Sequence, residues 1–419
     1  MTKTNRLTIL VFIAIVLAFA VGIAINKGAS KEFVASFAPN IKLLGTIFIR
    51  MVQMIISPLI FCTLVVGIAK LGDLKVIGRV GGKAMLWFFS ASLISLLLGM
   101  VLVNNLQPGK YIDLSHADTN GLKDLATKTQ EFSLKSFVEH VVPDSIVHAM
   151  SENAILQIVV FSVFFGVAAA SFGEYAKPVI KALDICSHVV LKMVEYVMNL
   201  APLGVFGTLC AVIAEKGIDI FKFYAVYFFS FLLGIFLLWV ILSAAGYILL
   251  KGRMTGLFRR ISSPLLVAFT TTSSESVFPT LTEQLELFGC QNKIVAFTLP
   301  LGYSFNLDGS MMYMTFASVA IAQAYHIHFD TGTELTMLMV LMLTSKGIAG
   351  VSRASLVVVL ATCSMFKIPP EGVALILPID HFCDMLRTST NVLGNAIATA
   401  VVSKWEKALG PEAKDVSTI

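Results

Sequence analysis

The chain has 419 residues, of which 57% are hydrophobic and 14% charged, with a formal net charge of +5. This apolar share exceeds that of soluble domains and is typical of a membrane protein. The positive charge is spread over short Lys and Arg clusters, so no nucleic-acid partner is expected. The six cysteines lie in apolar segments without paired or metal-ligand spacing, and we interpret them as small buried side chains.

The first part of the chain contains apolar runs of about 20 residues or more, long enough to cross a bilayer as helices. They lie at residues 7–25, 41–69, 84–106, 154–170, 179–214 and 221–250. The polar stretch 111–148 is expected to be an extramembrane loop. Basic residues precede the first run and follow the second and the sixth. The positive-inside rule therefore places both termini in the cytoplasm if the spans number about eight.

After Arg260, the apolar segments are interrupted by polar ones. The interruptions are "FTTTSSESVFPTL", "GYSFNLDGSMMY" and "TSKGIAGVSRAS". The pieces on either side are too short to span a bilayer, and a pair of broken segments indicates re-entrant hairpins, which are tolerated only where backbone is buried in protein or lines a cavity. The order of hairpin, interrupted helix, hairpin and polar-striped helix is one unit used twice, as in an inverted repeat.

The last apolar segment, residues 372–404, contains the polar stretch "IDHFCDMLRTSTNVLGN". On a helix of about 100° per residue, its polar side chains fall within roughly 50° of Asp384. They are Asp380, Arg387, Thr388, Asn391 and Asn395. Such a stripe is either a seam between membrane helices or a functional site. As a site, Arg387 offers a planar fork for a carboxylate and Asp384 an anion for an ammonium group, which suits an acidic amino acid.

Two shorter motifs indicate ion binding. In "NLDGS", Gly309 and its polar neighbours favour an unwound helix whose carbonyls, with Asp308, suit a hard cation; a capped helix kink is the structural alternative. In "TTTSSES", hydroxyls and amides can bind an anion at the positive end of a half-helix, although a Ser/Thr-rich loop has the same composition. Glu275 in this motif is interpreted as a structural ion partner or a proton carrier.

Together these residues resemble the dicarboxylate/amino acid:cation symporter family, which holds bacterial glutamate and C4-dicarboxylate carriers and animal excitatory amino-acid transporters. The matching stretches are "SSE" at 273–275, "GYSFNLDGS" at 302–310, "TSKGIAGV" at 344–351 and "DMLRTSTNVLGN" at 384–395. The resemblance implies an all-α polytopic membrane protein with about eight transmembrane helices, two re-entrant helical hairpins, inverted repeats and an elevator-type mechanism. It also implies a homotrimer, surrounded by lipid, in the inner (plasma) membrane.

The family's fold divides the chain into a scaffold and a moving transport domain. The scaffold would comprise residues 1–83 and 151–218, with an extracellular loop at 107–150 and a cytoplasmic tail at 407–419. The transport domain would comprise residues 84–106 and 219–406. Its second part would contain one hairpin at 254–290, a helix at 294–326, a second hairpin at 333–366 and a last helix at 370–406.

The resemblance assigns the substrate amino group to Asp384 and the substrate side-chain carboxylate to Arg387. It assigns the main-chain carboxylate to Asn391 and to the amides near Ser274 and Val351. The implied substrate-binding residues are Thr272, Ser273, Ser274, Ser310, Val351, Ser355, Asp384, Arg387, Thr388 and Asn391.

Cation ligands are also implied, partly through backbone carbonyls. These residues are Ser92, Gly302, Ser304, Asn306, Asp308, Ser345, Lys346, Ile348, Asn391 and Asn395. However, Asn395 stands where many members have Asp, and Phe88 and Ala91 stand where sodium-binding members have hydroxyls. The coupling ions can therefore be sodium ions, protons or both, and no covalent cofactor is expected.

The sequence thus predicts a secondary active symporter, not an enzyme, that takes L-glutamate or L-aspartate. The nearest alternative is a C4-dicarboxylate symporter for succinate, fumarate or malate. Asp384 discriminates between the two, because dicarboxylate carriers tend to have Ser at this position and have no amine to bind. An intramembrane aspartyl protease using Asp308 and Asp384 would need a Gly-x-Gly-Asp signature, which "NLDG" lacks. A passive anion channel is a third alternative, and it would not concentrate its substrate.

Overall fold

The computed structural model describes residues 3–71, 74–111, 141–217, 224–345 and 354–412. Within these ranges the chain is nearly all helical and contains no strand, only an isolated β-bridge between Cys290 and Leu409. The predicted helical class is therefore confirmed for the described residues.

The apolar runs of the first part form long helices joined by short ones. The long helices are α1 (Lys3–Gly28), α2 (Lys31–Leu71), α3 (Leu74–Leu106), α7 (Ile155–Ser171), α8 (Lys177–Met198), α9 (Ala201–Lys216) and α11 (Ala225–Leu250). The short helices are η1 (Pro108–Tyr111), α6 (Ile146–Ser151), η3 (Gly173–Ala176) and η4 (Lys251–Arg253). Most of the predicted loop at 111–148 lies outside the described residues, and α6 begins within its last part.

One boundary differs from the sequence prediction. The apolar run 179–214 was expected to be a single span, but it is divided between α8 and α9, with Asn199 and Leu200 between them. Pro202 lies in the first turn of α9. Its ring carries no N–H and clashes with the preceding turn of a continuous helix, so it suits a helix start better than a helix interior.

The interrupted segments of the C-terminal part form pairs of shorter helices. These are α12 (Met254–Thr271), η5 (Glu275–Val277), α13 (Phe278–Leu287), α14 (Asn292–Phe305), α15 (Asp308–Ala324), α16 (Thr331–Thr344), α17 (Ala354–Met365), η7 (Pro370–Leu375) and α18 (Leu377–Trp405). Thr272 ends α12 in the left-handed conformation, with φ of 52°. Asn306 and Leu307 separate α14 from α15, so the helix break predicted in "NLDGS" is present.

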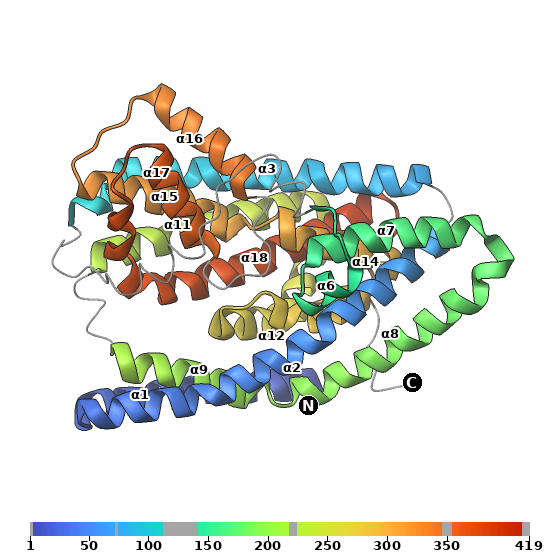
Figure 1. The fold of residues 1–419 in the computed structure, drawn as a ribbon, viewed down its shortest axis with the longest axis horizontal. Helices are drawn as coiled ribbons and strands as arrows, with labels where there is room; N and C mark the ends of the chain where they lie inside the picture. The colour runs from blue at the N-terminus through green and yellow to red at the C-terminus, as the bar shows by residue number, and fades with distance from the viewer. Residues whose placement is uncertain (1–2, 72–73, 112–140, 218–223, 346–353, 413–419) are drawn as a thin grey trace.

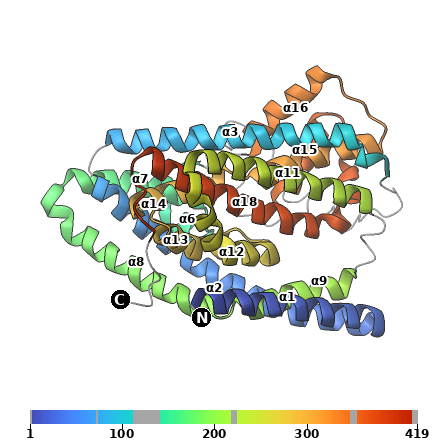
Figure 2. The same ribbon diagram turned by 180° about the vertical axis from the view of Figure 1, so that it is seen from behind.

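The helices form two sides of an elongated bundle (Figures 1 and 2). Helices α1, α2, α8 and α9 lie along one edge and pack on one another, whereas α3, α11, α15 and α18 pack together along the other. Contacts of α12 with α1 and α9, and of α14 with α2, join the two sides. The division of the chain into a scaffold and a transport domain stays a prediction.

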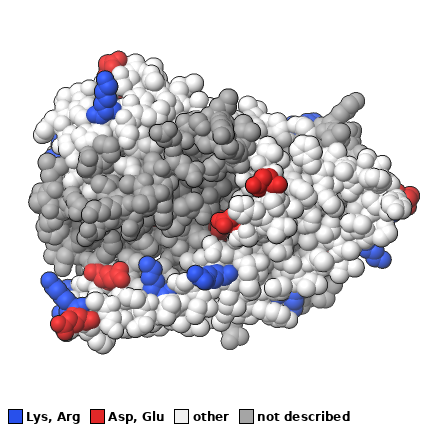
Figure 3. Space-filling model, viewed as in Figure 1, with Lys and Arg blue, Asp and Glu red and all other residues white. Residues whose placement is uncertain are grey.

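Many large hydrophobic side chains are exposed on the described helices. On the face in Figure 3, charged side chains of the described residues are few and scattered. By length and composition, four described segments are apolar enough to cross a membrane: Ile9–Gly28, Lys31–Ala69, Gly78–Leu106 and Ala225–Thr271. The expected total of about eight is not reached by this criterion, because α7 and α9 have only 17 and 16 residues and the helix at 294–326 is interrupted.

The segment that follows α18 ties this helix to its neighbours. Glu406 accepts hydrogen bonds from Arg79 at 2.7 Å and from Lys83 at 2.6 Å, both on α3. Beyond it, the Gly410 N–H donates to the Gly289 carbonyl at 2.8 Å. The bond from Arg79, with those from Lys83, holds the pKa of the Glu406 carboxyl below its ordinary value.

Replacing Glu406 with Gln should lower stability only slightly, by at most about 1 kcal/mol, because the Arg79 side chain is more than half exposed. The stabilisation by the ionised Glu406 should be fully present above the ordinary Glu pKa of about 4.3. It should disappear as pH falls through the lowered pKa of Glu406 in the folded protein. Thermal melting of detergent-solubilised protein at pH 7 and at acid pH would measure it. The exposed Glu152→Gln is the control, and an equal effect of Glu406→Gln at both pH values would contradict this assignment.

Candidate functional site

The polar stripe of α18 faces the interior and contains a buried ion-pair cluster. The side chains of Arg387 and Asp380 are 1% and 0% exposed, and that of Asp384 is 13% exposed. Arg387 donates from Nη1 to Asp380 Oδ1 and from Nε to Asp384 Oδ1, each at 2.8 Å. The spacings of three and seven residues place both carboxylates on the face that carries Arg387. The predicted stripe thus faces the interior of the bundle.

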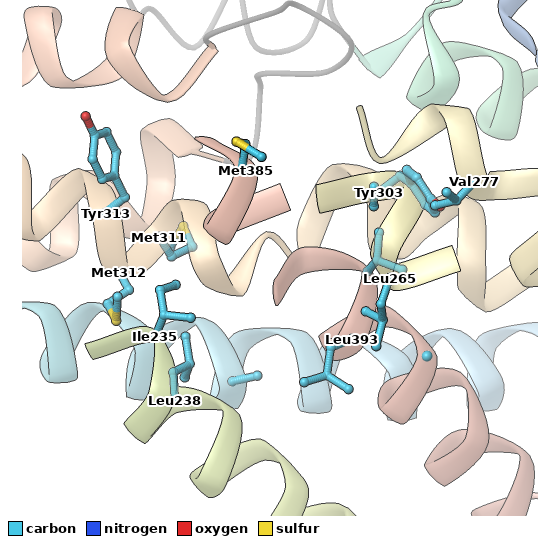
Figure 4. Packing of buried hydrophobic residues seen from close by; sticks show 14 of the residues in the cluster. Ile235, Leu238, Leu265, Val277, Tyr303, Met311, Met312, Tyr313, Met385 and Leu393 are labelled. Atoms are coloured by element: carbon cyan, nitrogen blue, oxygen red, sulfur yellow. The ribbon is translucent and has the colours of Figure 1, made fainter. Parts of the chain in front are cut away.

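Helix α15 supplies the wall behind this cluster. The ring centroid of Tyr313 lies 4.2 Å from Cζ of Arg387, which is a cation–π contact. The Tyr313 hydroxyl donates to Asp380 Oδ1 at 2.8 Å. Figure 4 shows Tyr313 on the helix that also carries Met311 and Met312. No sequence pattern indicated a role for Tyr313, although it is the last residue of "GYSFNLDGSMMY".

Arg387 keeps one donor for a further group. Among the described residues, no acceptor bonds its Nη2, although this atom is buried. A buried guanidinium N–H that lacks a partner costs free energy, so a carboxylate bound there would be stabilised. Asp384 also accepts from the Thr388 hydroxyl at 3.4 Å. The cluster therefore presents both a cationic donor and a carboxylate.

One turn farther along α18, Asn391 holds the start of α15. Its Oδ1 accepts from the backbone N–H groups of Gly309 and Ser310 at 2.9 and 3.2 Å, and its Nδ2 donates to the Ser310 hydroxyl at 3.0 Å. The first N–H groups of a helix have no partner within the helix, so the Asn391 side chain caps the N-terminus of α15. The helix break and α18 are joined into one site.

A second buried polar group lies one more turn along α18. Asn306 Nδ2 donates to Asp308 Oδ2 at 3.1 Å and to Asn395 Oδ1 at 3.2 Å, and all three side chains are at most 1% exposed. Among the described residues, Asn306 Oδ1 accepts no hydrogen bond, and the Ser304 hydroxyl has no hydrogen-bond partner. Buried oxygens of this kind suit a hard cation. No group of three His, Cys, Asp or Glu side chains in the described part has metal-ligand geometry, so such a site depends on amide, hydroxyl and carbonyl oxygens.

Two glycines let these groups approach each other. A Cβ atom at Gly394 would overlap Asp308 Oδ2, and one at Gly302 would overlap Asn395 Oδ1. The backbone of α18 therefore lies directly against the carboxylate at the start of α15.

The remaining predicted residues lie on other elements. Thr272, Ser273 and Ser274 form the turn after α12, where the Tyr303 hydroxyl donates to the Ser274 carbonyl at 3.0 Å. Ser345 and Ser355 are buried at the facing ends of α16 and α17, and Ser92 is buried on α3. The other predicted positions, Lys346, Ile348 and Val351, lie outside the described residues.

Long apolar helices around a buried polar cluster, in the part of the chain that the structure describes, are typical of a multi-pass membrane protein. The model of the sodium:dicarboxylate symporter family matches residues 7–405, and the chain belongs to this family.

Several bacterial relatives are similar over almost the whole chain. The C4-dicarboxylate transport protein of Laribacter hongkongensis (strain HLHK9) is 42% identical over 386 residues, which cover 90% of this chain and 86% of that protein. The C4-dicarboxylate transport protein of Bacillus subtilis (strain 168) is 37% identical, covering 99% and 97%. The proton/glutamate-aspartate symporter of the same organism is 36% identical, covering 94% and 95%. The predicted family is confirmed.

Replacing Gly394 with Ala should push α18 away from Asp308. Overpacking of a buried contact costs about 1–3 kcal/mol, so we expect a clearly lower melting temperature in detergent. Gly82→Ala is the matched control, because a methyl group at Gly82 would meet no heavy atom within 4 Å and Ala is the better helix former. Equal melting temperatures for Gly394→Ala and Gly82→Ala would contradict the close approach of α18 and Asp308.

Proposed function

We propose that this chain is a secondary active symporter that imports L-glutamate or L-aspartate together with sodium ions, protons or both. The observation that carries the proposal is the buried pairing of Arg387 with Asp384, in which Arg387 Nη2 keeps an unused donor. The guanidinium binds the substrate side-chain carboxylate, and Asp384 binds its ammonium group. Asn391, with the nearby backbone amides, binds the main-chain carboxylate.

The charges of the cluster favour a substrate that carries an amine. Asp380, Asp384 and Arg387 together have one net negative charge when all three are ionised. A dicarboxylate would add two further negative charges to this buried site, whereas an acidic amino acid adds one and brings an ammonium group to Asp384. Like charges are costly at low dielectric, so the amine offsets a repulsion that a dicarboxylate would meet.

A C4-dicarboxylate is the second candidate substrate, because relatives named C4-dicarboxylate transport proteins are at least as similar to this chain as the glutamate-aspartate symporter. Arg387 would serve such a substrate equally well, since its fork binds any carboxylate. The two candidates differ in what Asp384 would do: it binds an amine in one and must be protonated or displaced in the other.

For the coupling ion, we propose a site formed by Asn306, Asp308, Asn395 and nearby carbonyls. Asn395 is neutral, so the site attracts a sodium ion less strongly than one with a carboxylate there. We therefore propose that few sodium ions are coupled and that protons carry part of the coupling. The proposal includes an elevator movement of the transport domain, in a homotrimer in the inner membrane with both termini in the cytoplasm.

The test is uptake by purified protein in liposomes. Labelled L-aspartate, L-glutamate and succinate are offered under a sodium gradient at equal pH, and then under a pH gradient without sodium. We expect concentrative uptake of the amino acids with a shallow dependence on sodium. Concentrative uptake of succinate alone would support the second candidate, and dissipation of every preset substrate gradient would indicate a channel.

Replacing Asp384 with Ala should abolish uptake of both amino acids and weaken aspartate binding by about 100-fold or more. Truncating one partner of a buried charge pair costs roughly 2–5 kcal/mol, and a loss of about 2.8 kcal/mol already corresponds to about 100-fold. Calorimetric titration of aspartate measures the affinity, and the exposed Asp144→Ala is the control. Unchanged aspartate affinity in Asp384→Ala would disprove the assignment to the amino group.

Replacing Arg387 with Cys should remove recognition of the second carboxylate. We expect aspartate and glutamate to compete about 100-fold less well, as in Asp384→Ala. Small neutral amino acids such as serine or alanine should become substrates, because Asp384 and Asn391 still bind their ammonium and main-chain carboxylate groups. Competition assays with the variant and with Arg387→Lys, which keeps the charge without the fork, measure this. Aspartate competition equal to that of the wild type would rule out the role of Arg387.

A further inference from the structure

A carboxyl group outside the α18 site lies between the two sides of the bundle. Glu275 begins η5, the short helix in the turn between α12 and α13, and it is partly buried. Its carboxylate hydrogen-bonds to the side chain of Gln53 on α2. Helix η5 packs against α2, so the Glu275–Gln53 bond joins the turn to one of the helices on the opposite edge.

Helix α14 forms the other wall around Glu275. The phenol of Tyr303 lies within electrostatic reach of the carboxylate, and its hydroxyl donates to the carbonyl of the adjacent Ser274 at 3.0 Å. The ring of Phe278 packs edge-on against Tyr303, with centroids 5.3 Å apart. Figure 4 shows Tyr303 beside Val277, the last residue of η5.

The groups that interact with Glu275 are polar but uncharged: the Gln53 amide from α2 and the Tyr303 phenol from α14. Nearby in the chain, the hydroxyls of Thr271 at the end of α12 and Ser276 in η5 bond each other at 2.9 Å. On α13, Glu283 is exposed and Glu286 accepts from Asn292, and on α2 Arg50 is exposed. Among the described residues, no Lys or Arg forms an ion pair with Glu275.

We propose that Glu275 is a proton-binding group between the α12–α13 turn and α2, and that its protonation allows the turn to move along α2. This inference rests on the proposed symport function. The residues that follow Gln53 on α2 include the buried Ile55 and Ile56. A carboxylate that leaves its amide donor and passes such side chains incurs the free-energy cost of burying an unpaired charge. A neutral carboxyl has a much smaller free-energy cost of desolvation. The α12–α13 turn therefore moves along α2 faster when Glu275 is protonated than when it is ionised.

The test compares the wild type with Glu275→Gln, which mimics the neutral carboxyl. Initial uptake at saturating substrate is measured in liposomes with the same pH on both sides. The maximal rate of the wild type should fall several-fold as pH rises, whereas Glu275→Gln should keep the acid-side rate throughout with an unchanged KM. Glu283→Gln, an exposed carboxyl of the same helical pair, should keep the wild-type profile. Gln53→Leu should move the midpoint of the profile to higher pH, because the carboxylate loses its amide donor.

A second measurement does not depend on transport. Infrared difference spectra of purified protein should show a carboxyl band that titrates over the pH range of the rate change, present in Glu283→Gln and absent in Glu275→Gln. If the wild type shows the band but takes up no acidic substrate, the proposed function fails and the proton site stands. A wild-type profile in Glu275→Gln, a change confined to KM, or the band persisting in Glu275→Gln would each overturn the inference.

Discussion

The arrangement of this molecule depends on how the guanidinium of Arg387 is compensated. A cation that is 1% exposed must be matched by anions, because an isolated buried charge costs several kcal/mol. Asp380 and Asp384 supply them from the same face of α18. This face can therefore only be placed inside the bundle, where α3, α11, α12, α14 and α15 surround α18. The bond from Tyr313 to Asp380 then fixes how α15 lies against it.

The break between α14 and α15 follows from the same helix face. Asn391 lies one turn beyond Arg387 and satisfies the N–H groups that the break leaves free, and Asn395, another turn along, bonds Asn306 within the break. Successive turns of α18 thus carry a buried guanidinium, an amide that bonds backbone N–H groups and an amide that bonds the side chain of Asn306. Broken helices inside a membrane protein need such partners, since lipid offers none.

Much of this arrangement could be predicted from local pattern. The stripe on α18 follows from helical periodicity, and the break follows from the Gly and polar residues of "NLDGS". The division of 179–214 was missed because hydropathy outweighed the single signal of Pro202. The roles of Tyr313 and of the Glu406 contacts with α3 could not be predicted, because they join residues 67 or more positions apart and no periodicity within one segment encodes such pairs.

Under the proposed function, the same cluster accounts for the two candidate substrates. A guanidinium binds one carboxylate whatever the rest of the ligand is, so Arg387 suits both an acidic amino acid and a C4-dicarboxylate. The two substrates differ by a single ammonium group, and the atoms that would meet it belong to Asp384. A buried carboxylate with an ammonium partner is stabilised, whereas one beside a second carboxylate is repelled. Under the proposed function, selectivity between the two candidate substrates therefore depends on the charge of Asp384 on α18.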